Sequence, residues 1–251
     1  MKKPLSLNNA FPRPGTGELL KAARQGNTPA ARALLLQGAL INEKDAFGDT
    51  ALILAAENGH AEIVRLLLDR GASPNEKDPH GNSVLVLAVW GGHTETVRLL
   101  AEKGADINEK NSYGAIALIH AIWSRNTEIV RLLLDRGANI NNQDREGDTA
   151  LMVATRTHHE EIVRLLLDKG ADLDQKDNSG NTALLWAEKK CYTEISQLLK
   201  EEPEIRKRLA EEISRVIDAS AAEKAFRRAV ALKQERLRQQ ARLNRPNIRP
   251  K

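Results

Sequence analysis

Apolar side chains recur along this chain with a period of 33 residues. One phase of the period is leucine in every unit: Leu19, Leu52, Leu85, Leu118, Leu151 and Leu184. A second phase is alanine: Ala22, Ala55, Ala88, Ala121, Ala154 and Ala187. Glycine keeps the same period at Gly15, Gly48, Gly81, Gly114, Gly147 and Gly180. The chain is therefore built from six units, the first of them shortened.

Each unit contains two short helical patterns followed by a turn. In the unit 45–77, residues 50–57 combine good helix formers with apolar positions three and four apart, which predicts a first helix. Residues 61–69 predict a second helix, and Gly59 and Gly71 end the two helices. Residues 72–81 contain Pro, Asn, Asp and Gly, so they predict a tight hairpin loop to the next unit. Neither helix is long enough to be stable alone, so the units must stack on each other.

The sequence resembles the ankyrin repeat family, whose unit has 33 residues and a signature close to G-x-T-P-L-H-x-A. Residues 48–55 read GDTALILA, residues 147–154 read GDTALMVA, and residues 62–72 read EIVRLLLDRGA. The chain departs from the signature by lacking its proline and its histidine in every full unit. The resemblance implies an all-α ankyrin solenoid of about six helix-turn-helix units with short hairpin loops.

We divide the chain accordingly, with a C-terminal helical extension after the repeats. An N-terminal tail covers 1–14, and the repeat domain covers 15–202, with units 15–44, 45–77, 78–110, 111–143, 144–176 and 177–202. Pro203 lies where a stop glycine would stand, so we expect the last repeat to end there. Residues 203–243 form the helical extension with a basic arm, and 244–251 form a tail. The apolar spacing over 204–218 predicts an amphipathic helix that covers the end of the last repeat.

The turn between the two helices of a unit changes along the chain. It contains glycine at Gly26, Gly59 and Gly92, but the equivalent residues further on are Arg125, His158 and Cys191. A left-handed conformation at a non-glycine residue costs about 1 kcal/mol relative to glycine. The C-terminal repeats are therefore expected to be the weaker ones, and His158→Gly is expected to raise the melting temperature.

Charge is shared unevenly between the repeats and the C-terminus. Residues 224–251 carry ten basic residues and one acid, and since the whole chain carries +4, the other residues carry −5. The basic arm includes Lys224, Arg227, Arg228, Lys233, Arg236, Arg238 and Arg242. Such an arm could contact nucleic acid, an anionic membrane or an acidic protein. The alternatives are a solvated helix with a basic tail, which is the more favoured, and an address read by a bacterial export machine.

Composition and motifs exclude several classes of protein. The single Cys191 allows no internal disulfide and no multi-thiolate metal site. No apolar run is long enough to span a membrane and the first residues lack a secretory leader, so we expect a cytoplasmic protein. No nucleotide-binding or catalytic motif appears, so we expect no enzyme activity, cofactor, metal or small-molecule substrate. His158 and His159 are interpreted as a turn, His60 and His93 as structural, and His120 as a buried, hydrogen-bonded side chain.

Family resemblance also indicates where a partner binds. Ankyrin proteins usually bind partners on a concave surface formed by the hairpin tips and the first helices. At those phases this sequence has Phe47, Asp49, Glu57, His80, Asn82, Trp90, Tyr113, Ala115, Trp123, Arg145, Glu146, Asp148, Arg156, Lys189 and Lys190. Only 3% of the chain is aromatic, yet four aromatic residues fall in this set. We interpret them as an aromatic patch flanked by basic residues, typical of interface hot spots.

An alternative interpretation is that Trp90 and Trp123 pack between adjacent first helices. Trp186 falls in the phase of Leu54 and Leu87 and is expected to be core. The predicted function is non-enzymatic binding of another protein by a chain that is monomeric alone. The alternatives are an adaptor whose basic arm contacts nucleic acid or anionic membrane, and a bacterial effector that is exported into a host cell and binds a host protein there.

Overall fold

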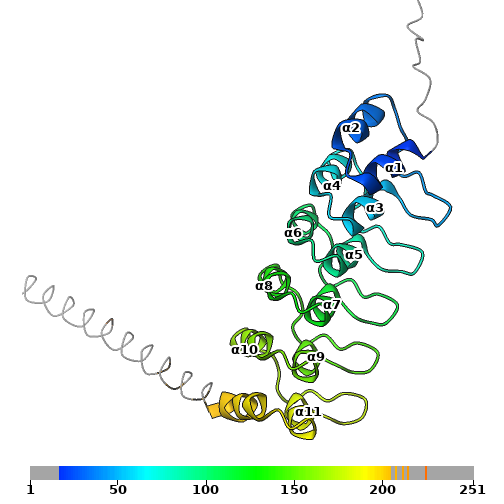
Figure 1. Cartoon of the computed structure of the whole chain (residues 1–251). Coiled ribbons are helices and arrows are strands. Elements are labelled where there is room, and N and C mark those ends of the chain that lie inside the picture. Colours follow the sequence, from blue (N-terminus) through cyan, green and yellow to red (C-terminus); the bar gives the residue numbers. More distant parts are fainter. Residues whose placement is uncertain (1–16, 205–206, 208–210, 212–213, 215–223, 225–251) are drawn as a thin grey trace, which may run out of the picture. The chain divides into compact units, whose positions relative to one another are not determined.

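The computed structural model describes residues 17–204 together with positions 207, 211, 214 and 224. The described part is helical, with isolated bridges Lys44–Thr50 and Lys77–Ser83 and no strands (Figure 1). First helices are α1 (Glu18–Gln25), α3 (Ala51–Glu57), α5 (Val84–Trp90), α7 (Ala117–Trp123), α9 (Ala150–Arg156) and α11 (Ala183–Lys189). Second helices are α2 (Thr28–Leu36), α4 (Ala61–Leu68), α6 (Thr94–Glu102), α8 (Thr127–Asp135) and α10 (Glu160–Asp168). The all-α fold class predicted from the sequence is confirmed.

The chain forms two compact units, Met1–Leu199 and Lys200–Lys251. Residues 193–204 are helical, so helical backbone continues through Pro203 instead of ending before it. The tails, most of the expected helix over 204–218 and most of the basic arm lie outside the described residues. Within the described part, no helix is both long and apolar enough to cross a membrane.

The helices of the compact unit Met1–Leu199 form two layers, with hairpin loops projecting from one side (Figure 1). Each first helix packs on the first helix of the next repeat, from α1 on α3 to α9 on α11. Second helices stack in the same order, from α2 on α4 to α8 on α10. Leucines of the repeat phase, such as Leu52, Leu85 and Leu118, are buried. The core is thus a continuous aliphatic stripe that needs few aromatic side chains.

Polar side chains fix the start of most first helices. The hydroxyl oxygens of Thr50, Ser83, Thr149 and Thr182 each accept a hydrogen bond from the backbone N–H three residues further on. Helix α7 differs, because its N-cap is Ile116, which makes no such bond and is buried. In the repeat 111–143, a buried apolar residue therefore stands where these four repeats have a hydrogen-bonding N-cap.

The turns between paired helices have the predicted left-handed conformation. The φ angles are 72° at Gly26, 73° at Gly59 and 70° at Gly92. Arg125, His158 and Cys191 follow with φ angles of 56°, 55° and 58°. These three non-glycine residues therefore adopt the left-handed conformation on which the expected cost depended, and each is expected to cost about 1 kcal/mol.

Ring side chains join these turns from one repeat to the next. The Nε2 atoms of His60 and His93 lie 3.2 and 3.0 Å from the carbonyl oxygens of Arg24 and Glu57. The His158 ring stacks on Tyr192, with centroids 4.1 Å apart. The structural role expected for His60 and His93 is confirmed, and His158 lies in an inter-helix turn as interpreted.

Candidate protein-binding surface

We define the inner surface as the hairpin tips together with the last residues of the first helices. Side-chain contacts place these two sets side by side. Arg24 at the end of α1 forms an ion pair with Asp45 of the first hairpin at 3.0 Å. Lys189 at the end of α11 donates a hydrogen bond to Asn181 Oδ1. The last residues of the first helices therefore face the hairpins.

Two tryptophans stand at the centre of this surface. Trp90 ends α5 and Trp123 ends α7, and they are 46% and 53% exposed. Both rings meet the buried His120 ring edge-on, with centroid distances of 5.2 Å for Trp90 and 5.7 Å for Trp123. We call these three residues the aromatic cluster. The imidazole fixes the position of both indoles while leaving much of each exposed.

His120 is held by hydrogen-bonding groups on both ring nitrogens. Trp90 Nε1–H donates to His120 Nδ1 at 2.9 Å, and Asn111 Nδ2 lies 2.9 Å from His120 Nε2. Burial lowers the pKa of His120 to about 4, so the ring is neutral at pH 7. The expectation of a buried, hydrogen-bonded histidine is confirmed.

The orientation of Asn111 leaves one imperfect contact in this network. Its Oδ1 accepts the backbone N–H groups of Tyr113 and Ala115 at 2.9 and 3.1 Å, which turns Nδ2 toward His120. With Nδ1 accepting from Trp90, the imidazole proton is on Nε2 and meets an amide nitrogen instead of an oxygen. The equivalent residues of the other hairpins are aspartates: Asp45, Asp78, Asp144 and Asp177. Sequence reasoning missed Asn111, although its departure from aspartate was a visible signal.

Three further predicted residues are exposed at hairpin tips. Phe47 and Tyr113 are 75% and 61% exposed, and His80 is exposed as well. The backbone N–H of Arg145 donates to the Tyr113 carbonyl at 3.0 Å, so the tips of consecutive hairpins are joined. Arg145 and Glu146 extend the row of exposed tip residues toward the C-terminal repeats.

The residue after each hairpin glycine is less available than expected. Asn82, Ala115 and Asp148 are buried, so the interpretation of this phase as binding surface was wrong for these residues. Asn82 Nδ2 donates to Asp78 Oδ2 at 3.0 Å, and the Asp148 carboxylate forms an ion pair with Arg156. Asp49, the equivalent residue of the first full unit, is half-buried.

A second cluster lies two repeats beyond the aromatic cluster. The Arg156 guanidinium lies over the Trp186 ring, 4.9 Å from its centroid, and Lys189 Nζ lies 5.6 Å from it. Trp186 Nε1–H donates to Asp177 Oδ2 at 2.8 Å. We call Arg156, Trp186 and Lys189 the cationic cluster. Trp186 is half-buried, so the expectation of a full core residue was wrong: among the described first helices, α11 packs only on α9.

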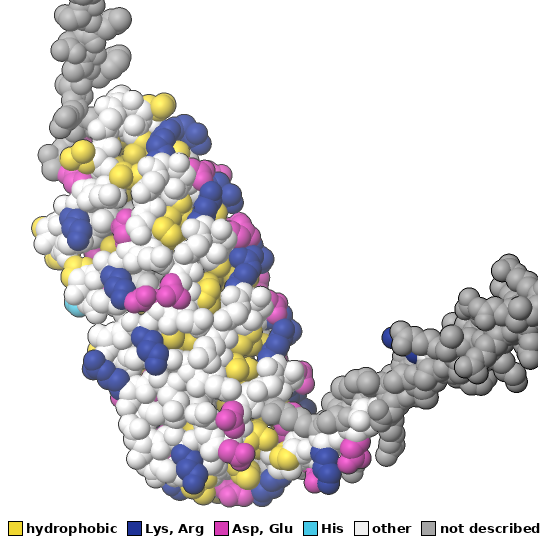
Figure 2. All heavy atoms as spheres, turned by 180° about the vertical axis from the view of Figure 1, so that it is seen from behind, with side chains coloured by type: hydrophobic (Ala, Val, Ile, Leu, Met, Phe, Trp, Pro, Cys, Tyr) yellow, Lys and Arg dark blue, Asp and Glu magenta, His cyan; other side chains and the backbone are white. Residues whose placement is uncertain are grey.

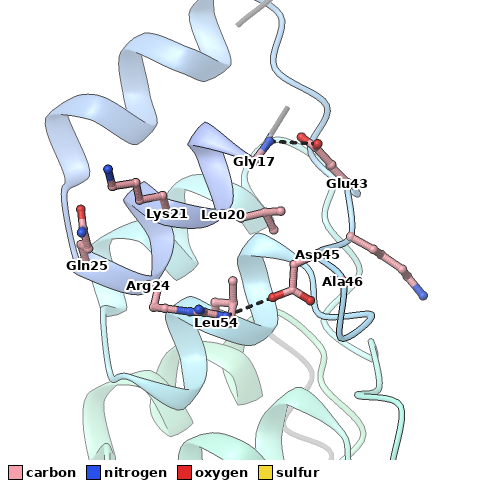
Figure 3. A pocket seen from close by; sticks show the side chains of 10 residues that line it. Gly17, Leu20, Lys21, Arg24, Gln25, Glu43, Asp45, Ala46 and Leu54 are labelled. Atoms are coloured by element: carbon pink, nitrogen blue, oxygen red, sulfur yellow. Dashed lines mark hydrogen bonds and ion pairs between the residues drawn. The ribbon is translucent and has the colours of Figure 1, made fainter. Parts of the chain in front are cut away.

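Carboxylates gather at the N-terminal end of the inner surface. Burial raises the pKa of Asp49, and the neighbouring charges of Asp45, Glu57 and Asp78 raise it further. Arg24 is the cation that opposes them there. A hollow of about 540 Å³ adjoins this end and is lined by Leu20, Arg24, Asp45 and Leu54 among others (Figure 3). The acidic end therefore begins beside an open depression.

Charges are arranged differently on the side seen from behind. There, Lys and Arg side chains alternate with Asp and Glu along the repeats (Figure 2). Ion pairs join successive second helices, as between Arg136 and Glu102 at 3.1 Å and between Lys169 and Asp135 at 2.7 Å. These ion pairs link neighbouring repeats.

Stacked helix pairs with an exposed, partly apolar inner surface define a solenoid of helical repeats. Residues 19–111, 91–144 and 118–209 match the family model described as "Ankyrin repeats (3 copies)". The chain belongs to the ankyrin repeat family, and its repeats form a protein–protein interaction module. The family predicted from the sequence is confirmed.

Solved structures support the assignment. The crystal structure of EF0377, an ankyrin repeat protein, is 36% identical with a TM-score of 0.70, covering 74% of this chain and 98% of that chain. A crystal structure of an ankyrin repeat domain from Acinetobacter baumannii AYE is 32% identical with a TM-score of 0.71, covering 75% of this chain and 99% of that chain. No curated protein shows significant similarity to this sequence.

Proposed function

We propose that the chain binds a protein partner on the inner surface, with Trp90 and Trp123 as the main anchors. One observation carries the proposal: two tryptophans are about half exposed while a buried histidine holds both rings in place. A rigid aromatic side chain loses little conformational entropy on binding. Tryptophan is also among the residues most often found as interface hot spots.

The surrounding residues supply the rest of the interface. Tyr113 and Phe47 add exposed apolar area at the hairpin tips, and Arg145, Arg156, Lys189 and Lys190 lie toward the C-terminal repeats. Asp49, Glu57 and His80 lie on the other side of the tryptophans. An apolar centre with charged surroundings is the usual arrangement of a specific protein interface.

The test compares proteins captured from lysate by the full chain and by a Trp90→Ala/Trp123→Ala variant. Each substitution is expected to cost about 2 kcal/mol in binding, so the double variant should lose its partner. A Leu36→Ala/Leu40→Ala variant is the control, since it removes two comparably exposed apolar side chains from the first repeat. A partner that binds the tryptophan variant as tightly as the wild type would overturn the proposal.

The two alternative functions remain separate hypotheses. An adaptor that contacts nucleic acid or anionic membrane would use Lys224 to Lys251, most of which lies outside the described residues. Its binding would weaken steeply with salt and would vanish when that segment is deleted. An exported effector would use the same inner surface on a host protein, so the tryptophan variant tests that case as well.

A further inference from the structure

Charged side chains differ in sign between the two ends of the inner surface. The N-terminal end carries four carboxylates and one cation: Asp45, Asp49, Glu57, Asp78 and Arg24. At the C-terminal end the exposed layer is mostly cationic: Arg145, Arg156, Lys189 and Lys190, with Glu146. Of the other carboxylates at that end, Asp148 and Asp177 are buried and Asp144 is half-buried. The exposed tryptophans lie between the two ends.

We propose that the inner surface takes an extended segment of a partner protein in one orientation. A Lys or Arg of the segment lies over the acidic end, apolar side chains cover Trp90 and Trp123, and an Asp or Glu lies beside Arg145. This proposal rests on the proposed function and adds the partner's chemistry and polarity to it. Charges of opposite sign on the two sides of an apolar patch favour a segment with complementary charges.

Two of the charged groups are free to meet a partner. Arg145 is fixed through its backbone, since its N–H donates to the Tyr113 carbonyl and its carbonyl accepts Asn178 Nδ2 at 2.7 Å. Its guanidinium has no ion pair within the described residues. The Glu57 carbonyl faces the His93 ring, while its exposed carboxylate also lacks an ion pair in that part of the chain. Neither group must leave a partner within the repeats in order to bind.

The acidic end is centred on the second repeat, residues 45–77. Lys21 and Lys44 line the hollow beside Arg24, one repeat before Glu57. Their positive charges would repel a cation in the hollow itself (Figure 3). The partner's basic side chain is therefore expected over Glu57 and Asp49, next to Trp90.

Repeat spacing gives the register of the segment. Packed helices lie about 8–10 Å apart, and an extended chain advances about 3.3 Å per residue. One repeat therefore corresponds to about three residues of the segment. Glu57, Trp90, Trp123 and Arg156 occupy equivalent positions in four consecutive repeats, and Arg145 belongs to the same repeat as Arg156. A matching segment has a basic residue, apolar residues about three and six positions further on, and an acidic residue about nine positions further on.

The experiment uses two synthetic peptides of identical composition that differ only in which end carries Arg and which carries Glu. Both contain two leucines at the spacing given above, separated by serines. Binding to the full chain is measured by fluorescence anisotropy at low salt. We propose that the surface also fixes the backbone direction of the segment. One peptide is then expected to bind about tenfold more tightly, because in that direction the other places like charges opposite each other at both ends.

A charge-exchanged protein identifies the source of this preference. The variant Glu57→Lys/Arg145→Glu is expected to prefer the other peptide. The control Glu62→Lys/Arg131→Glu makes the same exchange at two exposed positions of α4 and α8, and it should keep the wild-type preference. Circular dichroism and melting temperature verify that each variant is folded.

The outcomes separate this proposal from the proposed function. Equal affinities for the two peptides, or a preference that the inner-surface exchange does not change, overturn the polarity. If binding of the peptides still requires Trp90 and Trp123, the proposed function stands without the proposed polarity. Failure of both peptides to bind overturns the extended segment as occupant, whereas loss of partner capture by the tryptophan variant is a separate measurement.

Discussion

The aromatic cluster and the cationic cluster occupy equivalent positions two repeats apart. Trp90, His120 and Trp123 correspond to Arg156, Trp186 and Lys189, and Asn111 corresponds to Asp177. In the first cluster a polar ring is buried between two exposed indoles. In the second an indole lies beneath two cations. The same three backbone positions therefore present apolar surface in one place and positive charge in the other.

This exchange separates the residues that build the repeats from those that vary on them. The inner position of each cluster is a ring that faces the hairpin: His120 Nε2 lies beside Asn111 Nδ2, and Trp186 Nε1–H donates to Asp177. The side chains at the two outer positions contact that ring and are exposed to solvent. Binding properties can change at the outer positions while the stacked leucines remain as they are.

Removing the central ring of the cationic cluster is expected to have the largest effect on stability. Trp186→Ala would lose a half-buried indole and would remove one of the N–H donors to Asp177, leaving those of Ser179 and Asn181, so we expect a loss of about 3 kcal/mol. Trp123→Ala removes a more exposed ring with no hydrogen bond and should cost about 1 kcal/mol or less. Urea unfolding measures both. Equal losses would show that the outer tryptophan is as much a part of the core as the inner one.

The central ring of the aromatic cluster makes stability depend on pH. The pKa of His120 falls from 6.5 to about 4 on folding, so the unfolded chain binds its proton first as the pH drops. The stability that neutral His120 contributes is complete above about pH 6.5 and is lost by about 1.4 kcal/mol per pH unit as the pH falls toward 4. Between pH 7 and pH 5 the loss is about 2 kcal/mol.

Urea unfolding at the two pH values checks this expectation. A His120→Gln variant should show a smaller loss between pH 7 and pH 5, because the other histidines are more exposed. An equal pH dependence in both proteins would contradict the assignment to His120. Trp186 does not titrate, so we expect the central ring of the cationic cluster to add nothing to the pH dependence of stability.

Replacing Asn111 by aspartate makes the hairpin contact of the aromatic cluster resemble that of the cationic cluster. In Asn111→Asp a carboxylate oxygen can accept the His120 Nε2–H, and its charge favours the protonated ring. The pKa of His120 is expected to rise by about one unit, equivalent to about 1.4 kcal/mol. Titration followed by NMR of the imidazole measures the shift, with Asn108→Asp at an exposed hairpin as the control. An unchanged pKa would mean that the Asn111 side chain is not aimed at the ring.

Sequence periodicity predicted most of the fold because the repeat is encoded locally. Helix ends, left-handed turns and the stacked leucines each depend on residues within one unit or its neighbour. The exposed positions of Trp90 and Trp123 also followed from their phase. The phase could not reveal that Trp186 is half-buried, since that depends on how many repeats cover it. Nor could it reveal the contact between Asn111 and His120, which depends on side-chain orientation across a hairpin.

Glycine substitutions in the turns that follow the two clusters are expected to change stability least. Arg125 follows Trp123, and Cys191 follows Lys189, and both have positive φ angles. Cys191→Gly relieves the left-handed strain at an exposed side chain, so we expect a gain of about 1 kcal/mol. Arg125→Gly relieves the same strain but removes contacts of the guanidinium with His159 and with the Thr157 carbonyl at 3.0 Å, so its gain should be smaller.

His158→Gly completes the series, because its side chain stacks on Tyr192. Losing the stack offsets part of the relief, since aromatic pairs contribute about 0.5–1.5 kcal/mol. Melting temperatures should therefore rise most for Cys191→Gly and less for His158→Gly and Arg125→Gly. Equal gains at all three turns would mean that these side chains add nothing to the contact between repeats. A drop for Cys191→Gly would contradict the assignment of backbone strain to this turn.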